Sequence, residues 1–183
     1  MSDRIDILKI TDLESFPDHP FQVREDDAMR ETAESVKEYG ILTPILVRPL
    51  ENGHFQIVSG HRRTKACELA CVDEIPAIIR EMDYDSAVIA MVDSNLQREE
   101  ILPSERAAAY KMKVEAIRRQ CGRRSQSNEK NGDQLGHHLD DKLFDGRKSV
   151  EVVAEDAGES KTQVQRYIRL TELKPELQQM VDS

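Results

Sequence analysis

The chain has 183 residues, of which 38% are hydrophobic and 33% are charged, and its formal net charge is −9. This length permits one domain or two small ones, and an aromatic content of only 4% favours a helix-rich protein over a β-sandwich. The negative charge excludes indiscriminate binding to nucleic acid, because non-specific affinity comes from Lys and Arg side chains that neutralise phosphates. Residues 1–100 carry 21 acidic and 11 basic side chains, so the acidic surplus belongs to the front of the chain.

Nothing in the sequence predicts export or membrane insertion. The three cysteines, Cys67, Cys71 and Cys121, are too few and odd in number for a disulfide framework. No segment approaches the roughly 18 uninterrupted apolar residues that a membrane span needs, and the N-terminus lacks the apolar core of a signal peptide. We therefore expect a cytoplasmic protein with no membrane partner.

The first part of the chain predicts a mixed α/β domain. Residues Ile5–Ile10 have the composition of a short strand. Strands at residues 45–48 and 55–58 flank Asn52-Gly53, which is typical of a hairpin turn. Apolar spacing and end signals predict the other elements: a helix that Asp27 caps and Gly40 ends, a helix over Thr64–Ala70, a strand over Ile75–Ile79 and a helix over Ser86–Leu96.

From about residue 84 onward the sequence predicts helices only. Pro103 opens a helix that continues to about Gln120, and residues 121–147 predict a polar connection around one short helix. The expected domains are residues 1–84, whose motifs extend to about residue 100, and residues 85–183. A basic run is expected to follow DNA phosphates: Arg118, Arg119, Arg123 and Arg124.

Residues 150–169 match the pattern of a helix-turn-helix. Ala154 is the small residue where two helices touch, Gly158 lies in the turn and Val164 packs from the second helix. Ser160 and Gln163 form a capping box that satisfies backbone donors at the start of that helix. An ordinary helical hairpin with a solvated face is the alternative interpretation.

The second helix of this motif is expected to enter the major groove of double-stranded DNA. Arg recognises guanine and Gln recognises adenine through paired hydrogen bonds, each worth about 1–3 kcal/mol of discrimination. Gln163, Gln165 and Arg166 are the predicted base readers. The whole predicted DNA-binding set is Ser160, Lys161, Thr162, Gln163, Gln165, Arg166 and Arg169.

A second candidate site follows the hairpin, at Gly60-His61-Arg62-Arg63. A glycine after a strand and two arginines at a helix start bring backbone donors, the helix dipole and guanidinium groups together, which suits a phosphate. Taken alone, the segment also fits a surface turn with solvated arginines. His61 likewise has two interpretations, a ligand or a solvated histidine at the helix start.

Four ordered segments ahead of the helix-turn-helix are more specific: Pro20–Arg24, Gly40–Val47, Ser59–Ala66 and Asn95–Arg98. Together they resemble the ParB family of partition proteins, over about residues 10–182. The resemblance implies an α+β fold, in which a small mixed α/β domain like those of ParB and sulfiredoxin precedes an all-α DNA-binding domain. It also implies a CTP-gated DNA clamp that segregates a bacterial chromosome, plasmid or mobile element.

The same resemblance implies partners and site residues. The partners are CTP with magnesium, a centromere-like palindromic DNA site, a second copy in a dimer and a ParA-type ATPase, on the nucleoid or a plasmid. Members of the family usually continue into a C-terminal dimerisation domain, whereas this sequence stops at Ser183, as a truncated or a short member would. Either interpretation weakens the expectation of a permanent dimer and leaves nucleotide-driven contact between front domains open. The implied nucleotide-binding set is Gln22, Arg24 and Thr43 near the nucleoside, Gly60, His61, Arg62 and Arg63 at the triphosphate, Asn95 at the metal, and Arg98, which couples the site to the helices.

Two positions depart from the family pattern and leave CTP hydrolysis open. His61 and Ser94 stand where a glutamate is usual, and neither is a good magnesium ligand. We expect slow or absent hydrolysis, or replacement of the missing ligand by Asp93 or another carboxylate. Alternatives are a helix-turn-helix transcription regulator with a non-functional nucleotide domain and a sulfiredoxin-like reductase, whose reactive cysteine is missing before His61.

Overall fold

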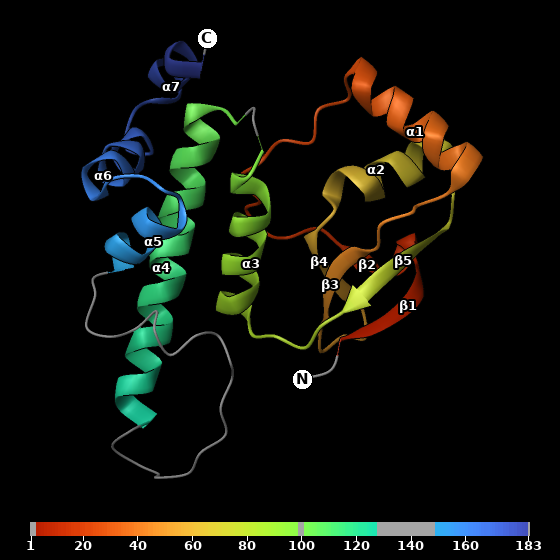
Figure 1. Ribbon diagram of the computed structural model, residues 1–183, viewed down its shortest axis with the longest axis horizontal. Coiled ribbons are helices and arrows are strands. Elements are labelled where there is room, and N and C mark those ends of the chain that lie inside the picture. Colours follow the sequence, from red (N-terminus) through yellow and green to blue (C-terminus); the bar gives the residue numbers. More distant parts are fainter. Residues whose placement is uncertain (1–2, 99–100, 128–148, 183) are drawn as a thin grey trace. The chain divides into compact units, whose positions relative to one another are not determined.

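The computed structural model describes residues 3–98, 101–127 and 149–182 (Figure 1). The chain divides into two compact units, Met1–Asn95 and Leu96–Ser183. This boundary is later than residue 84, because helix α3 (Tyr84–Leu96) lies almost wholly within the first unit. The ring of Tyr84 stacks on Phe16 at 5.4 Å between centroids, and the Arg48 guanidinium lies 5.5 Å from the Tyr84 ring.

The first unit contains a five-stranded sheet in the order β1-β5-β3-β4-β2. The hairpin of β3 and β4 and the pair β1–β5 are antiparallel, whereas β3–β5 and β2–β4 are parallel. The predicted hairpin is therefore present, and a further short strand precedes it along the chain. The bounds are β1 (Arg4–Lys9), a 3-10 turn η1 (Ile10–Asp12), β2 (Leu13–Glu14), β3 (Ile45–Pro49), β4 (Phe55–Ser59) and β5 (Glu74–Ile79).

Helices α1 (Asp27–Tyr39) and α2 (His61–Ala70) lie on the same side of this sheet (Figure 1). Alternate residues of β3, Ile45 and Val47, are fully buried, as a strand with one covered face requires. They belong to one hydrophobic core with residues of both helices and of the neighbouring strands: Leu8, Met29, Val36, Ala66, Cys67, Ile75 and Ala77. Burial of these side chains holds the start of α2 in place against β3.

The starts of both helices lie earlier than predicted, since α2 begins at His61 and not at Thr64. The N-cap of α1 is Asp26, whose carboxylate accepts from the backbone N–H of Met29 at 2.9 Å, and Asp27 is the first helical residue. The prediction that Asp27 caps the helix was therefore wrong by one residue, because two adjacent aspartates fit the sequence pattern of a cap equally well. Gly40 ends α1 as expected.

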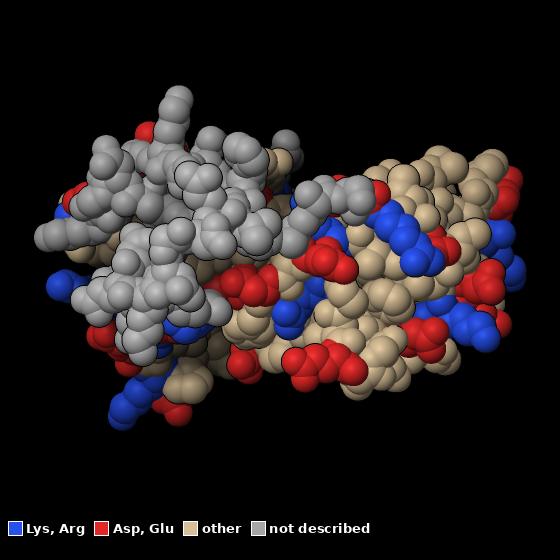
Figure 2. Space-filling view, turned by 90° about the horizontal axis from the view of Figure 1, so that it is seen from below, with Lys and Arg blue, Asp and Glu red and all other residues tan. Residues whose placement is uncertain are grey.

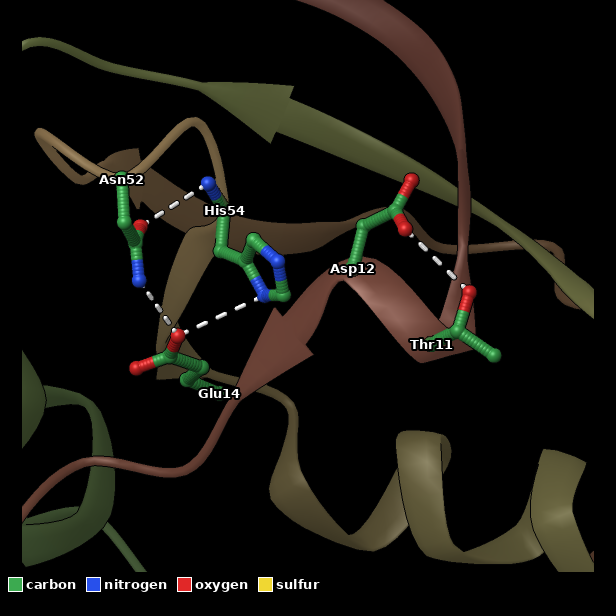
Figure 3. Close-up of polar contacts among 5 residues, drawn as sticks. All are labelled: Thr11, Asp12, Glu14, Asn52 and His54. Atoms are coloured by element: carbon green, nitrogen blue, oxygen red, sulfur yellow. Dashed lines mark hydrogen bonds and ion pairs between the residues drawn. The ribbon is translucent and has the colours of Figure 1, made fainter.

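Side-chain contacts fix the two-residue strand β2 to the turn of the hairpin (Figure 3). The amide nitrogen of Asn52 donates to Oε1 of Glu14 at 2.9 Å, and Nδ1 of His54 lies 3.4 Å from the same oxygen. The backbone N–H of His54 donates to the Asn52 side chain at 3.0 Å. Glu14 therefore joins β2 to the loop between β3 and β4.

The described part of the second unit is helical: α4 (Pro103–Ser127), α5 (Ser149–Asp156), α6 (Lys161–Leu170) and α7 (Pro175–Asp182). The sequence predicts the end of α4 near Gln120, but the helix continues through residues 121–127, which were expected in the connection. The remainder of that expected connection, residues 128–147, lies outside the described residues. None of the helices in the described ranges combines the length and apolar content that crossing a bilayer requires.

Candidate nucleotide site and nucleic-acid interface

Gly60 forms the corner between β4 and α2, where only glycine fits. Its φ is +111°, in the left-handed region that favours glycine. A Cβ atom there would lie 2.5 Å from Cγ2 and 2.9 Å from Cβ of Ile45. The glycine is thus required by the close approach of β3, whatever the corner binds.

Arg63 and Thr43, both predicted to contact nucleotide, are brought together. One guanidinium nitrogen of Arg63 donates to the carbonyl oxygens of Thr43 at 2.7 Å and of Pro44 at 2.6 Å. Arg63 is half-buried, and this burial lowers the pKa of its guanidinium. Arg63 therefore ties the loop before β3 to the start of α2.

Arg62 makes a different contact, with a carboxylate. Its guanidinium lies 3.5 Å from Oδ1 of Asp26, the N-cap of α1, and both side chains are partly exposed. The pKa of Asp26 is lowered first by the hydrogen bond from the Met29 N–H and further by the positive charge of Arg62. One carboxylate thus serves a helix end and an arginine.

His61, the first residue of α2, packs against a second histidine. The rings of His61 and His19 have centroids 3.9 Å apart, and Nδ1 of His19 lies 2.7 Å from the carbonyl oxygen of Phe21. His61 is half-buried, unlike the solvated histidine of the alternative interpretation. Nearby in sequence, Gln22 and Arg24 are exposed.

The predicted metal ligand, Asn95, is buried near the end of α3. Its amide nitrogen donates to the carbonyl oxygen of Met91 at 2.8 Å, which leaves the amide oxygen as the atom suited to a cation. The hydroxyl of Ser94 donates to the same carbonyl at 2.9 Å. Among the described residues, no group of three or more His, Cys, Asp or Glu side chains is arranged to hold a metal. These residues fit a magnesium ion only if nucleotide phosphates supply most of its ligands.

A pocket of about 380 Å³ in the first unit adjoins one face of α2. Its lining includes apolar residues such as Ile10, Leu13 and Ile57, and the charged pair Lys65 and Glu25, which lie 3.2 Å apart. Of the residues predicted to bind nucleotide, only His61 lines it. His61 is therefore the residue that joins this pocket to the corner formed by Gly60, Arg62 and Arg63.

The predicted helix-turn-helix is present as α5, a short turn and α6. Gly158 and Glu159 end α5 by donating to the carbonyl oxygens of Glu155 at 3.1 Å and Ala154 at 2.9 Å, the paired bonds of a Schellman motif. The Ser160 hydroxyl begins α6 by accepting from the Gln163 N–H at 3.2 Å. The sequence thus defines both ends of the turn.

Helix α6 buries one side and presents its polar side chains outward. Val164 is fully buried. Lys161 is the exception among the polar residues, because it is half-buried and lies 2.6 Å from Glu151 of α5. The other predicted DNA-binding residues are exposed: Ser160, Thr162, Gln163, Gln165, Arg166 and Arg169.

Helix α4 braces this motif through three side chains on one of its faces. Arg106 forms an ion pair with Glu159 at 2.9 Å, and Lys113, which is only 1% exposed, lies 2.6 Å from Asp156. Between them, Tyr110 packs edge-on against the ring of Tyr167 at 5.7 Å.

The Tyr110 hydroxyl belongs to the same brace. Burial, followed by the charge of Glu159, raises its pKa. Tyr110 therefore stays neutral. Both ends of the turn, and α6 itself, are fixed to α4.

Two other charged surfaces differ from the exposed face of α6. Arg118 and Arg119 of the basic run are exposed on α4, and Arg119 lies 4.0 Å from Glu115. The side chains of Arg123 and Arg124 lie outside the described residues. On the face of the first unit shown in Figure 2, basic and acidic side chains are interspersed, which does not suit a phosphate backbone.

The family model that describes the ParB N-terminal domain matches the sequence of residues 1–96, more than half of the chain. The chain belongs to the ParB family. The resemblance that the four ordered segments carry is confirmed, and so is the α+β class, in which a mixed α/β domain precedes a helical one.

Two relatives with sequences similar to this chain differ in how much of it they cover. Stage 0 sporulation protein J of Bacillus subtilis is 32% identical over 177 residues, which cover 97% of this chain and 52% of that protein. The probable chromosome 1-partitioning protein ParB of Deinococcus radiodurans is 42% identical over 108 residues, 58% of this chain and 37% of the relative. The chain therefore spans about half the length, or less, of these curated relatives.

A solved structure extends the likeness to both units. The C-terminally truncated chromosome-partitioning protein ParB from Caulobacter crescentus, complexed to the centromeric parS site, is 26% identical and matches with a TM-score of 0.56. The likeness covers 95% of this chain and 75% of that chain. The helical unit thus belongs to the ParB-like part of the fold together with the front unit.

The sequence does not single out two residues that lie at the corner before α2. His19 precedes the Pro20–Arg24 segment, and its packing on His61 follows only from the folded loop. Asp26 carries a helix-cap signal, but its contact with Arg62 depends on how α1 packs against α2. The sequence gives no signal for either contact.

Proposed function

We propose that the chain is a sequence-specific DNA-binding partition protein that segregates a chromosome, plasmid or mobile element. The observation that carries the proposal is the exposed polar face of α6 on a braced helix-turn-helix. The relatives with partition names and the Caulobacter crescentus ParB bound to parS support it. The target is a centromere-like palindrome, because a dimer binds two half-sites related by two-fold symmetry.

In the proposed complex, α6 enters the major groove. Gln163, Gln165 and Arg166 contact base edges, while Thr162 and Arg169 contact phosphates or sugars. Lys161 contributes less than its charge suggests, since Glu151 already neutralises it. The bracing contacts with α4 set the angle at which α6 is presented.

We further propose that the first unit binds CTP with magnesium at the corner before α2. The Gly60 backbone and the guanidinium groups of Arg62 and Arg63 hold the triphosphate, and the amide oxygen of Asn95 contributes to a magnesium ion that the phosphates carry. Arg98 couples the bound nucleotide to the helical unit. Nucleotide brings two copies together and a ParA-type ATPase acts on the complex; hydrolysis is slow, because neither His61 nor Ser94 supplies a carboxylate.

The DNA-binding role is tested with a palindromic duplex selected from a random library by the wild-type chain. We expect Arg166→Ala to weaken binding about 5- to 150-fold, the range for losing one bidentate base contact. The measurement is fluorescence anisotropy at fixed salt. Arg30→Ala, which removes an exposed arginine from α1, is the control and should change affinity little. Equal losses in both variants would contradict a base-reading role.

The alternative, a transcription regulator with a non-functional nucleotide domain, shares the exposed α6 face. The two functions differ in the effect of nucleotide on the DNA complex. We expect CTP, and no other ribonucleoside triphosphate, to change the dissociation rate of the wild-type chain from its duplex. Unchanged dissociation together with absent CTP binding in calorimetry would favour the regulator.

A further inference from the structure

Both arginines at the start of α2 are engaged by oxygen atoms of the chain itself. Arg63 donates to two neutral carbonyl oxygens at 2.6 and 2.7 Å from a half-buried position. Arg62 instead faces the negative carboxylate of Asp26 at 3.5 Å, with the two side chains 33% and 48% exposed. A nucleotide phosphate that approaches this corner therefore meets one arginine that supports the fold and one that is paired with a carboxylate.

We propose that Asp26 is an internal competitor for the nucleotide phosphates: its carboxylate occupies Arg62 until a triphosphate displaces it. This inference rests on the proposed nucleotide site. A carboxylate and a phosphate are alternative anionic partners for one guanidinium group, and both use its paired N–H donors.

Arg62 is the arginine that exchanges partners. An exposed ion pair at 3.5 Å contributes little to stability, so its loss costs the fold little. Release of Arg63 would instead leave the carbonyl oxygens of Thr43 and Pro44 without that donor. After the exchange, Asp26 keeps its hydrogen bond to the Met29 N–H and remains at the positive end of the α1 dipole.

The chain offers a substitution that separates the charge of Asp26 from its capping role. Asn is as good an N-cap as Asp, so Asp26→Asn keeps the bond to the Met29 N–H and removes the negative charge. Asp27→Asn removes the same charge one residue away, from a side chain that is 92% exposed and pairs with Arg30. Any general effect of charge appears in both variants.

The test is calorimetric titration of the full chain with CTP and, separately, with sodium tripolyphosphate. We expect Asp26→Asn to tighten binding of both probes by about two- to fivefold, the range for one exposed charge pair. Asp27→Asn should stay close to wild type. In an Arg62→Gln background, Asp26→Asn should give no gain, because the contested guanidinium is absent.

The outcomes separate this inference from the proposed function. Wild-type binding of CTP with equal affinity in Asp26→Asn, or an equal gain in Asp27→Asn, overturns the competition and leaves the nucleotide site intact. Binding by neither wild type nor Asp26→Asn overturns the nucleotide site and the competition with it. Thermal unfolding of Asp26→Asn at the wild-type temperature excludes an effect through helix α1.

Discussion

In the first unit, the two arginines predicted to bind a ligand, Arg62 and Arg63, contact oxygen atoms of the chain itself. In the helical unit, six of the seven predicted DNA-binding residues on and before α6 are exposed, with Gln163, Gln165 and Arg166 among them. The helical unit places its stabilising charges elsewhere, in the pairs Arg106–Glu159 and Lys113–Asp156. Substitutions can therefore separate folding from binding in the helical unit. At the corner before α2, Arg63 both supports the fold and belongs to the proposed nucleotide site.

The largest effect is expected at Gly60. Gly60→Ala introduces a Cβ 2.5 Å from Ile45 in a left-handed conformation and should lower the free energy of unfolding by about 3 kcal/mol. Gly158→Ala is the control in the other unit, because it has a φ of +66° with no atom within 4 Å of the added Cβ. It should cost about 1 kcal/mol, for backbone strain alone. Urea titration measures both, and equal costs would argue against the clash.

The next effect contrasts two arginines. Arg63→Ala removes a charged donor from the carbonyls of Thr43 and Pro44 and should destabilise the chain by about 1–2 kcal/mol. Arg166→Ala removes an exposed side chain and should change stability by less than about 0.5 kcal/mol. Urea titration of the two variants compares them directly. If Arg63→Ala were as stable as Arg166→Ala, the arginines of the two units would not differ in their contribution to folding.

The smallest effect concerns Lys161. Glu151→Gln removes its partner at 2.6 Å and frees the ammonium group for phosphate, so DNA affinity should rise about twofold. Glu155→Gln removes an exposed carboxylate from the same helix and controls for the change in net charge. Anisotropy at two salt concentrations measures both variants. The salt dependence should steepen only in Glu151→Gln.

Most of the fold follows from local patterns in the sequence. The Asn52-Gly53 turn between two short apolar segments predicts β3 and β4, and the signals at Gly158 and Ser160 predict the turn before α6. Strand β2 has only two residues, too few for any alternation, and depends on pairing with β4. Helix α4 passes through Gly122, because a helix interior tolerates one glycine at a cost of about 1 kcal/mol.

The candidate sites were predictable in residue type but not in partner. The sequence places Arg62 and Arg63 at a helix start, and this placement is present. Which oxygen each one contacts depends on the packing of α1 and β3 against α2, which no local pattern encodes. The pairing of Lys161 with Glu151 similarly joins two helices.

The Glu14 contacts with Asn52 and His54 matter for how copies meet. When two copies come together, as in the proposed dimer, the edge strands of each sheet meet a high local concentration of the other copy. A free edge strand invites pairing with another chain and hence aggregation. One edge is the two-residue strand β2, fastened by Glu14, and the other, β1, carries Arg4, Asp6 and Lys9. The short strand and the charges thus protect a crowded protein against misassociation.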